Sequence, residues 1–123
     1  MKLKLLLTFC LVMLLTVTAA IASISSNMKL IGAKFKTITL TMNDQSQAPK
    51  NIVLADEIIS AFKAVRVINP GVGNFSEFQA LIDQEIVLFG ELKKHLASGD
   101  KAQLLATIEQ INLVKKEAHS KFN

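Results

Sequence analysis

The stretch FSEFQALIDQEIVLFGELKKHLASGDKAQ, residues 75–103, carries the pattern that decides the fold. Its apolar residues recur at steps of three, four or seven, which is the spacing of one face of an α-helix. They are Phe75, Phe78, Ile82, Phe89, Leu92 and Leu96. Gly99 then predicts the end of this helix, and Asp100 with Gln103 three residues later predicts the cap of the next one. The stretch therefore predicts two helices joined by a tight antiparallel turn.

The same periodicity recurs in three further segments, which the polar loops NDQSQAP (43–49) and INPGVGN (68–74) and the turn at Gly99 delimit. The apolar face of the segment from about Ser25 to Met42 consists of Met28, Ile31, Phe35, Ile38 and Met42. That of the segment from about Pro49 to Val67 consists of Ala55, Ile58, Phe62 and Val65. In the segment 101–121 it consists of Leu104, Ile108, Ile111 and Ala118, and Phe122 follows directly. We expect an all-α protein, an antiparallel up-down-up-down four-helix bundle. In the closed form of that bundle the first and fourth helices lie side by side.

The first 22 residues have the organisation of a secretory signal peptide. MKLK supplies two lysines, LLLTFCLVMLL supplies an apolar run, and Ala20-Ile21-Ala22 supplies the small residues of a cleavage site. We expect cleavage before Ser23, a periplasmic location and no stable membrane association afterwards. Ser25 or Ser26 would then cap the first helix. The alternative is an uncleaved anchor, because the apolar run is close to the ~20 residues that a membrane span needs.

The chain that remains after cleavage is a single domain of residues 23–123. Its net charge falls from +4 to +2 because Lys2 and Lys4 are lost, and this charge is too small to indicate nucleic-acid binding. The one cysteine, Cys10, is lost as well, which excludes disulfides, thiolate metal sites and covalent haem attachment. No spacing places a nucleophile beside a base, so we do not expect an enzyme.

Met28 and His119 are the candidate functional pair. Met28 lies in the first turn of the first helix and His119 in the last turn of the fourth, so an antiparallel bundle puts both at one end. A thioether and an imidazole that face each other can fill both axial positions of a haem iron. The alternatives are a core-filling methionine and a solvated histidine. His95 belongs to the opposite end of the bundle, where it suits a helix C-terminus.

Glu85 interrupts the apolar face of residues 75–97. We expect its side chain to rotate to the surface and Ile86 to take the inward position. A carboxylate-bridged di-iron site would need Glu-x-x-His pairs on facing helices. The candidate pairs end in Lys94 and Asn112 instead of histidine, so the sequence disfavours that site.

Residues 27–42, NMKLIGAKFKTITLTM, and 75–123, ending SGDKAQLLATIEQINLVKKEAHSKFN, resemble the soluble periplasmic cytochrome b562 family. The resemblance implies a monomeric electron-transfer protein with one noncovalent haem b per chain and a redox partner that it does not name. It implies Met28 and His119 as the iron ligands. It also implies a haem pocket in which Phe78 and Lys115 take part. Ile31 and Ile82 complete the expected cofactor-binding residues.

The chain departs from the family pattern at several positions. Lys115 stands where the family has arginine, Ala118 where it has tyrosine, Asn123 where it has arginine, and Ile82 where it has a second pocket phenylalanine. The loop between the second and third helices is also shorter. These changes affect the haem edge but neither ligand. The alternative function is a helical chaperone or adaptor of the cell envelope that binds no haem.

Overall fold

The computed structural model describes the backbone of residues 2–122 and the side chains of residues 22–122. Its elements are α1 (Lys2–Thr41), the short 3-10 helix η1 (Gln45–Gln47), α2 (Ala48–Arg66), α3 (Phe75–Ser98) and α4 (Lys101–Phe122). No strand occurs between residues 2 and 122. The prediction of an all-α four-helix bundle is confirmed.

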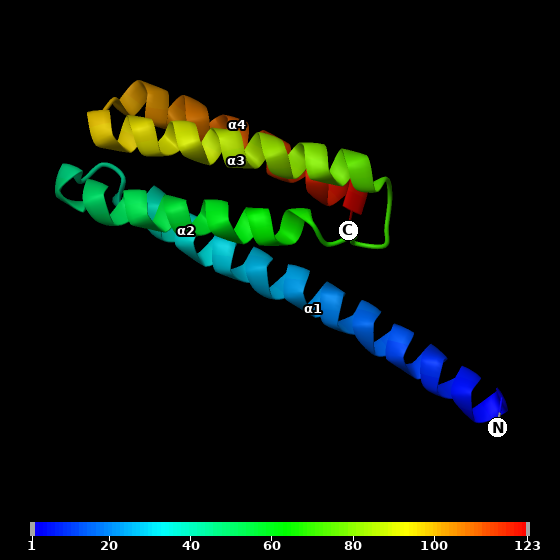
Figure 1. Cartoon of the computed structure of the whole chain (residues 1–123). Helices are drawn as coiled ribbons and strands as arrows, with labels where there is room; N and C mark the ends of the chain where they lie inside the picture. The colour runs from blue at the N-terminus through cyan, green and yellow to red at the C-terminus, as the bar shows by residue number, and fades with distance from the viewer. Residues whose placement is uncertain (1, 123) are drawn as a thin grey trace.

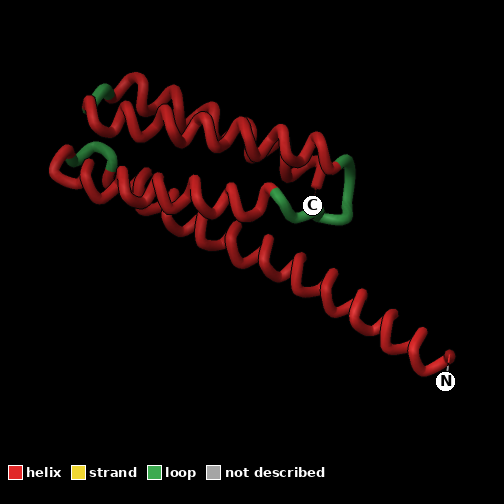
Figure 2. Tube along the Cα trace, in the orientation of Figure 1, coloured by secondary structure: helices red, strands yellow, loops and turns green. Residues whose placement is uncertain are grey.

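The four helices form two layers, with α1 beside α2 and α3 beside α4 (Figure 1). The loops alternate between the two ends of the bundle, and the longest, between α2 and α3, crosses from one layer to the other (Figure 2). Successive helices pack on each other, but α4 does not return onto α1 with comparable packing. The closed arrangement, in which these two helices would pack together, is therefore not formed. One seam of the bundle, between α1 and α4, stays open.

The first helix is longer than expected. It runs without a break from Lys2 to Thr41, so Ser25 and Ser26 lie inside it and do not cap its start, and Met28 lies in its second half instead of its first turn. No proline interrupts this stretch, and its single glycine is Gly32. The predicted signal peptide, residues 1–22, lies outside the residues with described side chains except for Ala22, and so does Asn123. Within residues 22–122, no helix combines the length and the apolar character needed to cross a bilayer.

The core consists of the predicted faces of α1, α2 and α3, and a shifted face of α4. The buried apolar residues on the first three helices include Ile31, Ile38, Ala55, Ile58, Phe62, Val65, Phe78, Ile82, Phe89, Leu92 and Leu96. On α4, Thr107 and Val114 are buried beside the expected Leu104 and Ile111, whereas Ile108, Ala118 and Phe122 are only half-buried. Because α4 packs mainly on α3, its buried face turns toward α3.

The predicted turn between α3 and α4 is confirmed. Gly99 ends α3 in the left-handed conformation, with φ of 71°, and its N–H donates to the His95 carbonyl. Asp100 caps α4, since its Oδ1 accepts a hydrogen bond of 3.2 Å from the Gln103 N–H. A glycine is favoured at this position because a Cβ raises the energy of the left-handed region.

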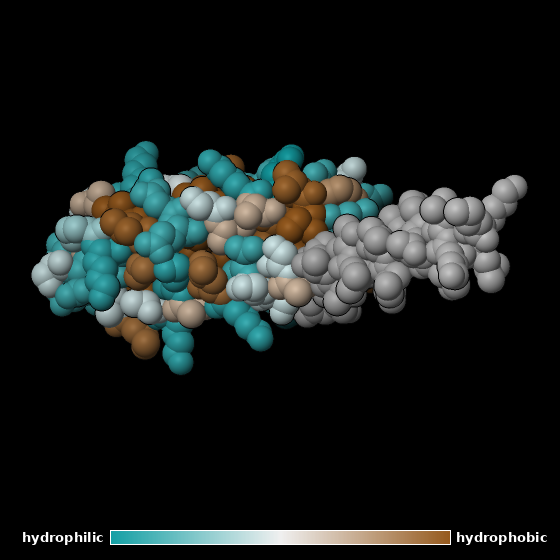
Figure 3. Space-filling view, turned by 60° about the horizontal axis from the view of Figure 1, so that its bottom comes forward, coloured by the Kyte–Doolittle hydropathy of each residue, from teal (hydrophilic) through white to brown (hydrophobic). Residues whose placement is uncertain are grey.

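The surface view shows apolar side chains in patches separated by polar ones (Figure 3). Large apolar side chains that are at least half exposed occur on every helix, among them Leu40, Val53, Val87 and Leu113. Such exposed apolar residues are common on soluble proteins and do not by themselves indicate a docking surface.

Replacing Gly99 by alanine tests the turn. Gly99→Ala should lower the free energy of unfolding by about 1–2 kcal/mol, the cost of a left-handed conformation for a residue with a Cβ. The new Cβ would also lie 2.7 Å from Gln45 Oε1, which must move. Gly90→Ala is the matched control, because Gly90 is exposed inside α3 with nothing within 4 Å of its Cβ position. It should stabilise the protein by about 0.5–1 kcal/mol. Urea unfolding measures the free energy of unfolding of both variants. Equal effects of the two substitutions would contradict the left-handed conformation of Gly99.

Candidate functional site

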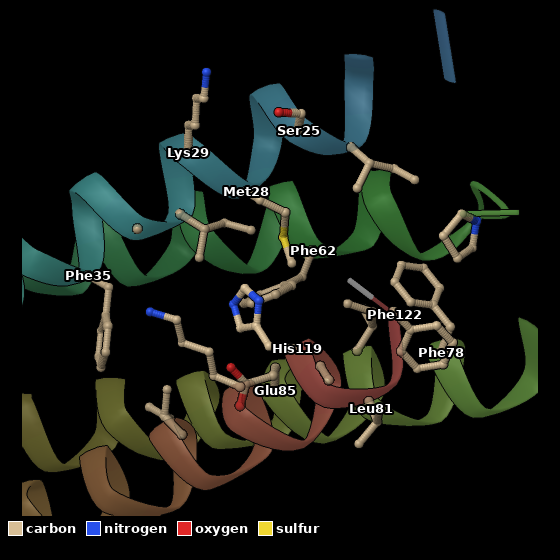
Figure 4. Close-up of a pocket in the computed structure, with 18 of the residues that line it drawn as sticks. Ser25, Met28, Lys29, Phe35, Phe62, Phe78, Leu81, Glu85, His119 and Phe122 are labelled. Carbon is tan, nitrogen blue, oxygen red and sulfur yellow. The ribbon is translucent and has the colours of Figure 1, made fainter. Parts of the chain in front are cut away.

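A cavity of about 620 Å³ occupies the open seam between α1 and α4 (Figure 4). Its walls come from all four helices and from the loop between α2 and α3, and most of the wall is apolar. Ligand pockets of proteins commonly have volumes of about 300–1,000 Å³ and mainly apolar walls with a few polar groups. The cavity therefore has the size and the character of a binding site for an organic molecule.

Met28 and His119 face each other across this cavity. Met28 projects from α1 with its sulfur directed inward, and His119 projects from the last turns of α4 toward it (Figure 4). The expected proximity of the two side chains at one end of the bundle is thus present in the structure. All six predicted site residues line the cavity: Met28, Ile31, Phe78, Ile82, Lys115 and His119. His95, in the last turn of α3, is not among the lining residues.

Contacts with α3 and with the preceding loop hold the C-terminal turn of α4 that carries His119. The ring of Phe122 packs edge-on against that of Phe78, with centroids 5.3 Å apart. Lys121 donates a hydrogen bond of 3.3 Å to Glu77. The loop approaches so closely that a Cβ on Gly73 would lie 2.8 Å from the Phe122 ring. A helix terminus held in this way presents its histidine in a defined direction.

An aromatic cluster supports the other side of the cavity. Phe35 of α1 and Phe62 of α2 both contact Phe89 of α3, with ring centroids 5.4 and 5.8 Å apart. All three rings line the cavity, and Phe89 is only 1% exposed. Because the cluster joins three helices, it sets the distance of α1 from α3 and so the depth of the site.

Glu85 is the buried polar group of the cavity, and its predicted orientation was wrong. The residue is 7% exposed and lines the cavity, while Ile86 is only half-buried. Its Oε1 is buried without a hydrogen-bond partner among the described residues. Burial raises the pKa of the Glu85 carboxyl to about 8, although the positive charge of Lys115 lowers it in part. The carboxyl lies inside because Glu85 belongs to the buried face of α3, three residues after Ile82 and four before Phe89.

The sequence did not indicate several lining residues. Pro70 and Val72 belong to the loop between α2 and α3, whose conformation no helical periodicity describes. Gly32 lies one turn after Met28, and nothing lies within 4 Å of the place where its Cβ would be. A glycine inside a helix costs about 0.5–1 kcal/mol relative to alanine. Its position four residues from Met28, on the same face, is the signal that could have revealed it.

The rim of the cavity carries positive charge. Lys115 is exposed, and its positive charge lies close enough to lower the pKa of the Glu85 carboxyl. Lys29 also contributes to the lining, but its ammonium group points away from the cavity (Figure 4). The chamber thus combines apolar walls with a cationic edge and with two facing side chains, Met28 and His119, whose sulfur and ring nitrogen can donate electron pairs to a metal.

Comparisons of the chain with protein-family models, with curated proteins and with solved structures found no match.

Protonation of Glu85 makes the stability of the unliganded protein depend on pH. The folded state keeps the proton up to about pH 8, whereas the unfolded chain releases it near 4.5. Between these values the folded state binds more protons, so stability falls as the pH rises. From pH 5 to pH 9 the free energy of unfolding should fall by up to about 4 kcal/mol.

Glu85→Gln should remove most of this dependence, and urea unfolding at a series of pH values measures it. Glu91→Gln is the control, since Glu91 is an exposed glutamate on the same helix. If the wild-type protein is as stable at pH 9 as at pH 5, Glu85 is not buried as a protonated carboxyl.

Proposed function

We propose that the protein is an exported electron-transfer protein that binds one noncovalent haem b, with Met28 and His119 as axial ligands of the iron. The observation that carries the proposal is the facing arrangement of these two side chains across an apolar cavity of about 620 Å³. The resemblance of residues 27–42 and 75–123 to the cytochrome b562 family supports it. Export through residues 1–22, action as a monomer and exchange of electrons with a partner protein belong to the same proposal.

The residues around the cavity fit such a cofactor. When bound, haem supplies a one-electron couple between ferric and ferrous iron. Phe78 and Ile82 of α3 and Ile31 of α1 would pack against its apolar faces and exclude water. Lys115 lies at the rim of the cavity, where its ammonium group can pair as a point charge with a carboxylate at the edge of the haem. With Met28 and His119 both holding the iron, no coordination position would remain for oxygen, which agrees with electron transfer instead of oxygen chemistry.

Substitution of the two ligands tests the proposal. Haemin added to the wild-type protein and then reduced should give the sharp absorption bands of low-spin iron. Met28→Ala and His119→Ala should each lose these bands and bind haemin at least about tenfold more weakly, a change of 1.4 kcal/mol. Met42→Ala and His95→Ala are the controls, because neither residue is among those lining the cavity; both should keep the wild-type spectrum. A wild-type protein without such bands contradicts the proposal and favours a helical bundle without haem.

Filling the cavity is an independent test that leaves both ligands in place. Gly32 lines the cavity beside Met28, so Gly32→Phe would put a ring at the cavity wall. It should abolish haemin binding without loss of helical content, and the unliganded protein should be at least as stable as the wild type. Gly90→Phe places the same side chain on an exposed position of α3 and should bind haemin normally. Unchanged binding by Gly32→Phe would mean that the cofactor lies elsewhere.

A further inference from the structure

The binding of a ligand in the cavity does not by itself explain the presence of a buried carboxyl at Glu85. Its side chain reaches the cavity from the middle of α3, is 7% exposed, and leaves Oε1 without a partner among the described residues. An apolar residue at this place would pack with Ile82 and Phe89 and avoid the loss of hydration. Burying a carboxyl without a partner costs several kcal/mol if it is charged. Such a group holds a proton unless a positive charge lies nearby.

The charges around Glu85 are few. On α4, Lys115 and His119 line the cavity with it, and on α1 only Lys29, whose ammonium group points outward. The lining residues from α2 and from the loop are Phe62, Pro70 and Val72, none of which titrates. The next acidic residue toward the start of α3, Asp83, pairs with Arg66. The state of the Glu85 carboxyl therefore depends on Lys115 and on whatever charge the occupant of the cavity brings.

We propose that Glu85 takes up one proton when the iron bound in this cavity is reduced, so that electron uptake is coupled to proton uptake. The inference rests on the proposed function. One electron from a one-electron donor converts ferric to ferrous iron, and one proton from solvent converts the Glu85 carboxylate to the carboxylic acid. Charge and atoms balance, because one negative and one positive charge enter the site together.

The physical reason is the low polarity of the cavity. Ferric iron adds a positive charge that favours the ionised carboxylate, and reduction removes that charge. In an apolar environment the two charges interact more strongly than in water. The raised pKa of Glu85, about 8 in the unliganded protein, puts the exchange in an accessible pH range. Solvent can supply the proton, since Lys115, which lies close to Glu85, both lines the cavity and is exposed.

The test is the reduction potential of the haem-loaded protein between pH 5 and pH 10. In the wild type the reduction potential should fall as the pH rises, because reduction binds a proton. The slope should approach about 59 mV per pH unit within one pH window, the range in which Glu85 is ionised before reduction and protonated after it. Glu85→Gln should have no such window and keep only the weak slope of the cofactor's own carboxylates. Glu91→Gln, an exposed control on the same helix, should follow the wild type.

A second variant and a second readout make the test sharper. Lys115→Gln removes the charge that lowers the pKa of Glu85, so the window should move to higher pH. Infrared difference spectra of reduced minus oxidised protein should show a protonated carboxyl that is absent in Glu85→Gln. Parallel potential curves for the wild type and Glu85→Gln overturn this inference alone. A wild-type protein that binds no haem overturns the proposed function and, with it, this inference.

Discussion

The contact of Phe89 with Phe35 and Phe62 is the interaction on which the shape of the molecule depends. These rings join α3 to both helices of the other layer in the middle of the bundle. Large side chains at this level keep α1 and α3 apart, and α4, which packs mainly on α3, has no comparable contact with α1. The bundle is therefore closed on three sides and open on the fourth, and the cavity is the space left between the aromatic cluster and the end of the bundle.

The cavity combines two requirements that usually conflict. Its walls must be apolar to take up an organic molecule, yet the part of α1 around Met28 and the C-terminal turn of α4 that carries His119 must be held firmly enough to present both side chains. Contacts of Phe122 with Phe78 and of Lys121 with Glu77 hold α4 without filling the space. On α1, Gly32 leaves the space beside Met28 free. An empty apolar chamber loses packing energy, so an occupant that filled it would stabilise the fold.

Glu85 adds a charge-sensitive group to this chamber. A buried carboxyl lowers stability compared with an apolar residue, and the effect grows as the pH rises. Its retention in the wall is understandable if the occupant changes charge, because the carboxyl then responds to each change. In the proposed function these three features act together: the facing donor atoms would bind a metal, the apolar walls would hold a ring system, and Glu85 would bind a proton for charge balance.

The sequence by itself determined α2, α3 and α4 and the residues that could act together, whereas the start of α1 and the buried face of α4 differ from its prediction. Apolar spacing located the buried faces of α2 and α3, Gly99 and Asp100 located a turn, and antiparallel order brought Met28 and His119 to one end. Only the tertiary structure decided that α1 and α4 stay apart, that Glu85 points inward and that Pro70, Val72 and Gly32 line the site. Periodicity along one helix reports which face is buried, but not how far the facing helix stands away. That distance depends on contacts such as Phe35 with Phe89, between residues more than fifty positions apart in the chain.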